Sequence, residues 1–278
     1  RDTLPEICIA RYRILTEFYM QNPALTGILR RAKAMREIFE KLPIRIGNDE
    51  VIVGNQSAKY RAGALYPEDC VSFIKDEVAS GTIRTREIDP YEISDEDMKY
   101  VADTIDYWLH GMSTYAQTAE YYPEQYAPHD FNGVTCVGKM TISDTPVGHF
   151  ATGYDKVIRT GLSAIRDEAV QKQKELIDNF MQGDEIDKYN FYRAVEIVCD
   201  GMITFAKRYS RLAAEKALTE SNPARKAELE KMAECLNWTM ENPARNFMEA
   251  LQCLYMYQTC LCLDANMHGI SFGRGAQY

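Results

Sequence analysis

The segment Ile46–Asn55 reads Ile-Gly-Asn-Asp-Glu-Val-Ile-Val-Gly-Asn and stands out from the helical patterns around it. Its three consecutive β-branched residues, followed by glycine, predict a strand or an extended segment over Asp49–Asn55. On its N-terminal side, apolar residues at helical spacing predict a helix over Leu4–Met20 and a second one from Pro23 to about Leu42. We therefore expect helices to dominate, with a few strands among them.

Helical patterns also cover most of the second half of the sequence. Ser94 precedes three acidic residues and predicts a helix start, because a serine side chain caps free N–H groups and acidic side chains suit that end. Asn222-Pro223 and Asn242-Pro243 predict two more starts, with asparagine as the cap and proline in the first turn. The expected helices run over residues 154–180, 186–219 and 223–240, and from about 245 into a buried strand; residues 122–153 are expected to form a long loop.

The composition is that of a globular protein. The 278 residues are 46% hydrophobic and 26% charged, from which we expect one domain over residues 1–278. The net charge of −9 would repel a phosphate backbone, so no nucleic-acid partner is expected. The apolar run Cys253–Leu263 is too short to span a bilayer, so no membrane partner is expected either. The eight cysteines show neither a disulfide framework nor a zinc spacing, and they predict reduced thiols in the cytoplasm.

The final segment, Asp264–Tyr278, has the composition of a functional site. It is polar, contains His268 and three glycines, and follows the dense apolar run. A chain that stops on such a segment is expected to be a piece of a larger protein.

Short motifs occur along the chain in an order that resembles one enzyme family. The matching segments are Leu4–Glu17, Leu29–Ala34, Ile46–Asn55, Arg61–Glu68, Gly148-His149 with Tyr154 and Gly161, Glu249–Gln252 and Ser271–Arg274. Each motif is short, but the ordered series covers nearly the whole chain. It resembles the glycyl radical enzymes, the pyruvate formate-lyase-like proteins, and above all their dehydratase and decarboxylase branches.

The resemblance implies an α/β fold in which helices surround a ten-stranded barrel, with this chain as its helix-rich N-terminal part. It also implies that the family's catalytic Cys-x-Glu loop and the loop that carries the glycyl radical lie outside this chain, because no cysteine here stands two positions before a glutamate. The chain alone is therefore expected to be inactive. Residues 273–277, Gly-Arg-Gly-Ala-Gln, also depart from the family pattern, which has an aspartate before the glutamine.

The resemblance further implies the cofactor and the partners of the complete protein. No cofactor or metal is expected on this chain. A glycyl radical on a residue outside it would be installed by a radical S-adenosylmethionine activating enzyme with an iron–sulfur cluster. The other expected partners are a small-molecule substrate, the remainder of the enzyme or a complementary chain, and a second copy in a homodimer. The implied context is anaerobic metabolism.

Four residues are candidates for the site. By resemblance His149, just before a predicted helix, is the catalytic residue that gives a proton to a departing hydroxyl, and an imidazole titrates near neutral pH as that task requires. His268, Ser271 and Asp264 are candidates for binding the substrate. Each has a structural alternative: the histidines could bond to loop backbone, and Asp264 could be a partnered carboxylate or a solvated one at the end of an apolar run.

Dehydration, the radical lysis of a C–O bond in a small polar substrate, is the favoured reaction because His149 matches that branch. Within the family, the alternatives are a decarboxylase, a C–N or C–S lyase, or a formate acetyltransferase-like enzyme. Outside these reactions, the chain could be a truncated or split helical subunit without catalysis. It could also be an unrelated helical interaction protein.

Overall fold

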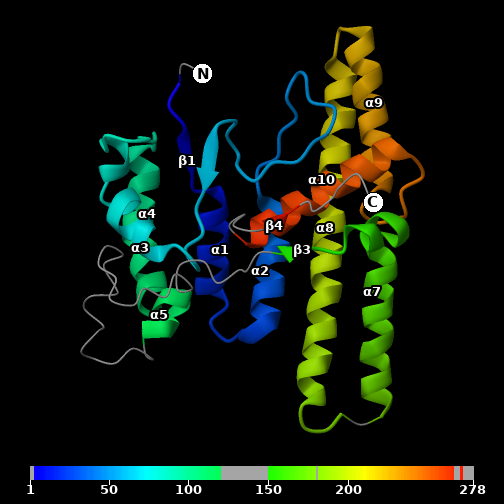
Figure 1. Ribbon diagram of the computed structural model, residues 1–278, viewed down its shortest axis with the longest axis horizontal. Helices are drawn as coiled ribbons and strands as arrows, with labels where there is room; N and C mark the ends of the chain where they lie inside the picture. Colours follow the sequence, from blue (N-terminus) through cyan, green and yellow to red (C-terminus); the bar gives the residue numbers. More distant parts are fainter. Residues whose placement is uncertain (1–2, 120–149, 180, 266–269, 272–278) are drawn as a thin grey trace. The chain divides into compact units, whose positions relative to one another are not determined.

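The computed structural model describes residues 3–119, 150–179, 181–265 and 270–271 (Figure 1). Backbone contacts divide the chain into two compact units. The first comprises Arg1–Thr16, Ser57–Phe150 and Ala265–Gly269, and the second comprises Glu17–Gln56, Ala151–Asp264 and Ile270–Tyr278. The single domain expected over the whole chain stays a prediction.

The first unit combines a short parallel sheet with small helices. Strand β1 (Glu6–Cys8) pairs with β2 (Ala62–Ala64), so that Ile7 lies opposite Gly63. The helices are the first part of α1 (Ala10–Gln21), α3 (Val71–Phe73), α4 (Asp95–Tyr107) and α5 (Thr114–Ala119), with π-helical turns over Ile74–Ala79 and Trp108–Met112 and a 3-10 turn over Thr82–Arg84.

Two fully buried polar side chains organise the core of this first unit. The indole nitrogen of Trp108 donates to Oγ1 of Thr16 over 2.9 Å. The Arg11 guanidinium forms an ion pair with Glu68, to which Nη1 donates over 3.1 Å. Both groups are satisfied inside the unit, as buried polar atoms must be to avoid a large desolvation cost.

The second unit is built around the long helix α8 (Glu185–Thr219). Helix α8 packs against α2 (Gly27–Lys41), α7 (Tyr154–Asp178) and α9 (Pro223–Trp238). Figure 1 shows α7 and α9 lying along α8, while α10 (Phe247–Asp264) crosses it. The strand β4 (Ile270–Ser271) follows α10 and pairs with β3 (Phe150–Ala151), which precedes α7.

Several predicted helix boundaries are confirmed. Ser94 caps α4, since its hydroxyl accepts the N–H of Asp97 over 3.1 Å. Asn222 caps α9 by accepting the N–H of Ala224 over 3.0 Å, with Pro223 in the first turn. These are the local interactions that asparagine, serine and proline supply at helix starts.

Other predicted boundaries are wrong. The helix expected from Leu4 begins at Ala10, because residues 6–8 are drawn into the parallel pair with β2. The helix expected from Pro23 begins at Gly27. Asn242-Pro243 does not start α10; Asn246 does, by accepting the N–H of Glu249 over 3.0 Å. The strand expected after that helix is absent from residues 247–264, which stay helical throughout.

Of the two forms predicted for Asp49–Asn55, a strand or an extended segment, the strand does not form, and the reason lies in how the backbone of Val53 is satisfied. The N–H of Val53 donates to Oε1 of Gln252 (2.9 Å), and Nε2 of Gln252 donates back to the carbonyl oxygen of Val53 (2.8 Å). One side-chain amide on α10 therefore supplies both bonds that a neighbouring strand would supply. Both residues are almost completely buried.

Asn55 fixes the end of the same segment on helix α8. Its backbone N–H donates to the hydroxyl of Tyr209 over 2.8 Å, and that hydroxyl donates to the Asn55 side-chain oxygen. The Asn55 amide group also donates to the carbonyl of Pro43 over 3.0 Å. Between these anchors, a Cβ atom at Gly54 would lie 2.9 Å from Oγ1 of Thr259, so only glycine lets the segment approach α10 this closely.

Helix α7 is kinked at Gly161, where a loop between α9 and α10 meets it. Gly161 has φ +74°, and its neighbour Leu162 donates its N–H to the carbonyl of Met240 over 2.7 Å instead of to its own helix. Ala244 in turn donates its N–H to the carbonyl of Ile158 over 2.9 Å. At the kink, backbone groups of α7 bond to this loop in place of their own helix, and these bonds are the cause of the kink.

Replacing Gly161 by alanine is expected to lower the free energy of unfolding by about 3 kcal/mol or more, because strain and overlap add. A Cβ there would lie 2.3 Å from the carbonyl oxygen of Glu241, and the backbone has a positive φ. Urea unfolding followed by circular dichroism measures the loss. Gly183→Ala is the matched control: it has φ +56° with nothing within 4 Å, so only about 1 kcal/mol is expected. Equal losses for the two variants would contradict this explanation of the kink.

Candidate functional site

The structure locates two of the four predicted site residues. Asp264 is the last residue of α10, and Ser271 lies in β4. His149 and His268 lie outside the described residues. The candidate site is therefore described from the elements that flank these positions: α7, α10, β3 and β4.

The pairing of β3 with β4 joins two predicted segments that lie far apart in the sequence. Strand β3 begins directly after His149, and β4 contains Ser271. Between β3 and α7, the hydroxyl oxygen of Thr152 is buried and has no hydrogen-bond partner in the described part of the chain. Buried hydroxyls are normally bonded, so this junction is a place where a further polar group would be stabilised.

Asp264 is held by an arginine of helix α2. Nε and Nη2 of Arg31 each lie 2.7 Å from Oδ1 of Asp264, and Nη2 also donates to the Asp264 carbonyl oxygen. A cation at this place suits the C-terminal end of α10, where carbonyl groups lack helical partners. The Asp264 carboxylate is thus partnered, but it is not a buried one, since its side chain is 49% exposed. Its role in binding substrate stays a prediction.

Sequence reasoning missed a buried polar cluster between α7 and α10. The hydroxyl of Tyr154, the first residue of α7, donates to Oε1 of Gln258, and Nε2 of Gln258 donates to Sγ of Cys262 over 3.4 Å. The Tyr154 ring also meets Tyr257 edge-on, with centroids 5.7 Å apart. The available signal was Gln258 itself: a glutamine within an apolar run must find a partner if it is buried.

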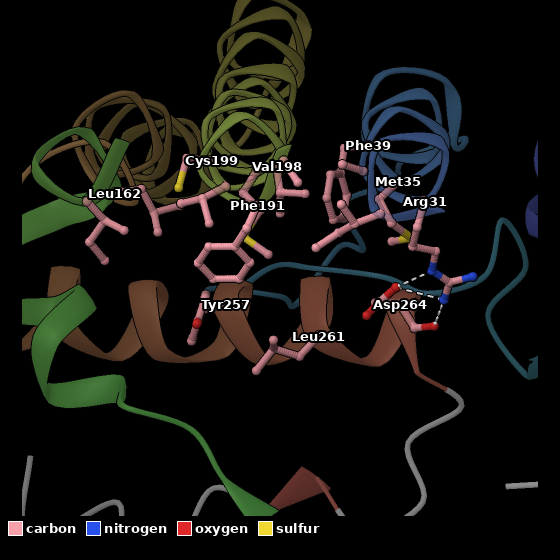
Figure 2. A pocket seen from close by; sticks show the side chains of 16 residues that line it. Arg31, Met35, Phe39, Leu162, Phe191, Val198, Cys199, Tyr257, Leu261 and Asp264 are labelled. Carbon is pink, nitrogen blue, oxygen red and sulfur yellow. Dashed lines mark hydrogen bonds and ion pairs between the residues drawn. The ribbon is translucent and has the colours of Figure 1, made fainter. Parts of the chain in front are cut away.

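A cavity of about 350 Å³ lies between α2, α7, α8 and α10 in the second unit (Figure 2). Its walls are mostly apolar, and Figure 2 shows Tyr257 and Leu261 of α10 facing Phe191 of α8 across it. The Arg31–Asp264 pair lies at one end. The two charges neutralise each other, so the cavity can hold apolar groups but offers no group for proton transfer.

Burial keeps the thiols Cys199, Cys253, Cys260 and Cys262 of this second unit protonated near neutral pH. Loss of solvent on burial raises the pKa of Cys199, which lines the cavity, to about 12. Burial likewise raises the pKa of Cys253 and Cys262 to about 11, and that of Cys260 well above its usual value. Nucleophilic chemistry and metal binding both require the thiolate. In the described part of the chain no cluster of histidine, cysteine and carboxylate groups could hold a metal ion.

These raised pKa values predict that the protein loses stability in alkali. Unfolded thiols ionise at about pH 8.5, whereas folded Cys199 keeps its proton until about pH 12. Above pH 9 the unfolded state therefore binds fewer protons, and the free energy of unfolding falls by up to about 1.4 kcal/mol per pH unit for each such group. We expect equal urea midpoints at pH 7 and 8 and a lower midpoint at pH 10.5. Cys199→Ala should show a smaller fall, and an equal fall in this variant would contradict the assignment.

Comparison with known proteins identifies the family. The pyruvate formate lyase-like family model matches residues 1–278, so the chain belongs to this family. Isethionate sulfite-lyase of Oleidesulfovibrio alaskensis is 32% identical over 99% of this chain and 33% of its own length. The probable dehydratase YbiW of Escherichia coli is 28% identical over 99% of this chain and 33% of its own length. The match excludes the alternative of an unrelated helical interaction protein.

Solved structures show the same fold. The B12-independent glycerol dehydratase of Clostridium butyricum superposes with a TM-score of 0.89 at 30% identity, over 100% of this chain and 34% of that protein. The structure described for 1,2-propanediol dehydration in Roseburia inulinivorans gives the same TM-score, and the superposition covers 99% of this chain and 34% of the chain in that structure. The predicted α/β fold and glycyl radical enzyme family are thus confirmed, and this chain spans the N-terminal third of such proteins.

The helices described here are not membrane spans. None of those that the structure describes combines the length and the apolar character needed to cross a bilayer.

Proposed function

We propose that this chain is the N-terminal part of a glycyl radical lyase that removes water from a small polar substrate. Relatives named for dehydration act on 1,2-propanediol, glycerol, (2S)-3-sulfopropanediol and trans-4-hydroxy-L-proline, each a small molecule with a hydroxyl group. The observation that carries the proposal is the pairing of β3 with β4, because it supports one site built from the segments of His149 and Ser271.

His149 acts as the acid in this proposal. When the C–O bond breaks, its electron pair leaves with the oxygen, and a proton from the imidazolium turns the departing hydroxyl into water. Ser271 and His268 bind substrate hydroxyl or carboxylate groups. Asp264, at the C-terminal end of α10 beside Arg31 of α2, also binds the substrate. A glycyl radical outside this chain, installed by a radical S-adenosylmethionine activating enzyme with an iron–sulfur cluster, would supply the radical chemistry, by way of a cysteine that also lies outside this chain.

Lysis of a C–S bond is the second candidate. It is favoured by the isethionate sulfite-lyases, since those of two organisms are each 32% identical to this chain over 99% or more of its length. In that reaction isethionate would yield acetaldehyde, sulfite and a proton, which together account for all its atoms and charge. A decarboxylase receives less support, because indoleacetate decarboxylase of Tractidigestivibacter scatoligenes is 25% identical.

The complete protein is expected to form a homodimer in the cytoplasm and to be assembled with the residues that carry the radical. A formate acetyltransferase-like or C–N lyase activity and a non-catalytic split subunit are the remaining alternatives. The two enzyme alternatives predict a different product from that of the proposed dehydratase, and the non-catalytic subunit predicts no product.

The test uses the complete protein, activated under anoxia by its activating enzyme and supplied in turn with propane-1,2-diol, glycerol and isethionate. We expect an aldehyde from a diol, and a loss of about 10²-fold or more in kcat for His149→Ala, the size typical for removing a general acid. His110→Ala is the control, because that side chain is 72% exposed and is not part of the proposed site. Sulfite from isethionate without aldehyde from either diol would favour the C–S lyase. No product and no glycyl radical signal would favour the non-catalytic subunit.

A further inference from the structure

Tyr154 and Gln258 lie on the two helices that neighbour the paired strands in the sequence. Tyr154 opens α7 three residues after Ala151 of β3. Gln258 lies on α10 six residues, or about 9 Å of helix, before Asp264, after which the chain continues to β4. A bond between these two side chains therefore ties the entry to α7 to the exit from α10.

The bond is made in a fully enclosed place. Tyr154 is 0% exposed and Gln258 is 7% exposed. The phenolic hydroxyl donates to Oε1 of Gln258, while Nε2 of the same amide donates to Cys262 one turn further along α10. Both ends of the amide are thus engaged, which fixes its orientation. An enclosed bond of this kind is costly to break, because water cannot replace the lost partner there.

The two other side-chain anchors of α10 described above join it to different elements. Gln252 holds the segment at Val53, and Asp264 holds Arg31 of α2. The bond from Tyr154 joins α10 to α7, and α7 follows β3, the strand that begins directly after His149. Of the three anchors, at Gln252, Gln258 and Asp264, only the one at Gln258 therefore connects the helix before β4 with the helix after β3.

We propose that Tyr154 and Gln258 are a positioning pair that holds β3 against β4. This inference rests on the proposed function, in which His149 and Ser271 flank or occupy these strands. Neither side chain touches the reacting atoms; each acts by keeping the strands in place. Displacing a proton donor by about 1 Å can cost about 10²-fold in rate, so a fixed pair beside the strands has a direct consequence for catalysis.

Hydrogen exchange in the complete protein tests the pair without any assay of activity. Tyr154→Phe removes one hydroxyl and keeps the ring against Tyr257. We expect the amides of β3 and β4 to exchange at least about 10-fold faster in this variant. Tyr209→Phe is the matched control, because it removes another fully buried hydroxyl from the same unit. It should speed exchange around Asn55 and leave β3 and β4 unchanged. Unchanged exchange at β3 and β4 in Tyr154→Phe, or an equal increase in both variants, would overturn the proposal.

Kinetics then separate positioning from stability. In the activated enzyme, Tyr154→Phe should lower kcat by about 10- to 100-fold with KM changed less than about threefold. Tyr154→Phe/Gln258→Met replaces both members of the pair by apolar side chains of similar size and should recover part of the lost thermal stability, since neither half of the pair is left behind. Its kcat should stay low. Recovery of kcat together with stability would show a merely structural role and overturn the proposal.

The two proposals fail in distinguishable ways. An activated wild-type protein that converts none of the three substrates would refute the proposed function, while the exchange experiment would still test whether the pair holds the strands. Normal turnover in Tyr154→Phe, with slow exchange at β3 and β4, would refute the pair and leave the proposed function intact.

Discussion

The pair of hydrogen bonds between the Gln252 side chain and the backbone of Val53 is the constraint on which the second unit depends. A segment of extended backbone that is buried needs partners for both its N–H and its carbonyl groups. Here a single amide on α10 supplies them, at 2.9 and 2.8 Å, and no neighbouring strand is needed. The segment can then lie directly against α10, which requires a glycine at position 54.

Helix α10 gains a fixed position from this arrangement. Gln252 holds its first half, while Gln258 and Asp264 hold its second half through Tyr154 and Arg31. In the sequence β4 follows α10 and β3 precedes α7, and the positioning role proposed for Tyr154 and Gln258 rests on this order. The irregular segment itself anchors α10 within the second unit, through Gln252. The cavity beside α10 has no comparable chemistry, because its thiol is protonated and its two charges are paired.

Sequence reasoning succeeded where the deciding interactions are local. Ser94 and Asn222 cap helices by bonding to backbone N–H groups two or three residues away. In α8, apolar residues recur at helical spacing over the whole length of the helix, and many of them are buried. It failed where a distant partner decides. The β-branched run before Gly54 predicts a strand or an extended segment, but nothing in it tells that the Gln252 side chain supplies the bonds of a neighbouring strand. Residues 6–8 fit a helical period yet pair with β2 instead.

At the candidate site, too, sequence reasoning identifies local features and misses contacts with distant partners. Ser271 lies in a motif that resembles the family and Asp264 is a candidate because it ends an apolar run; the structure adds that Asp264 is partnered by Arg31, from a helix more than 200 residues earlier. The bond between Tyr154 and Gln258 joins residues 104 positions apart, a separation at which periodicity and caps carry no information. The polar residue inside an apolar run was the one local sign of it.

Native-state hydrogen exchange at the amide of Val53 tests the central claim most directly, since that N–H is bonded to Gln252 and to no strand. The account predicts that Val53 exchanges as slowly as the buried middle of α8 and that Gln252→Leu accelerates it by orders of magnitude more than it accelerates α8. Exchange of Val53 in the wild-type protein at the rate of an exposed turn, or an equal acceleration of Val53 and α8 in the variant, would contradict it.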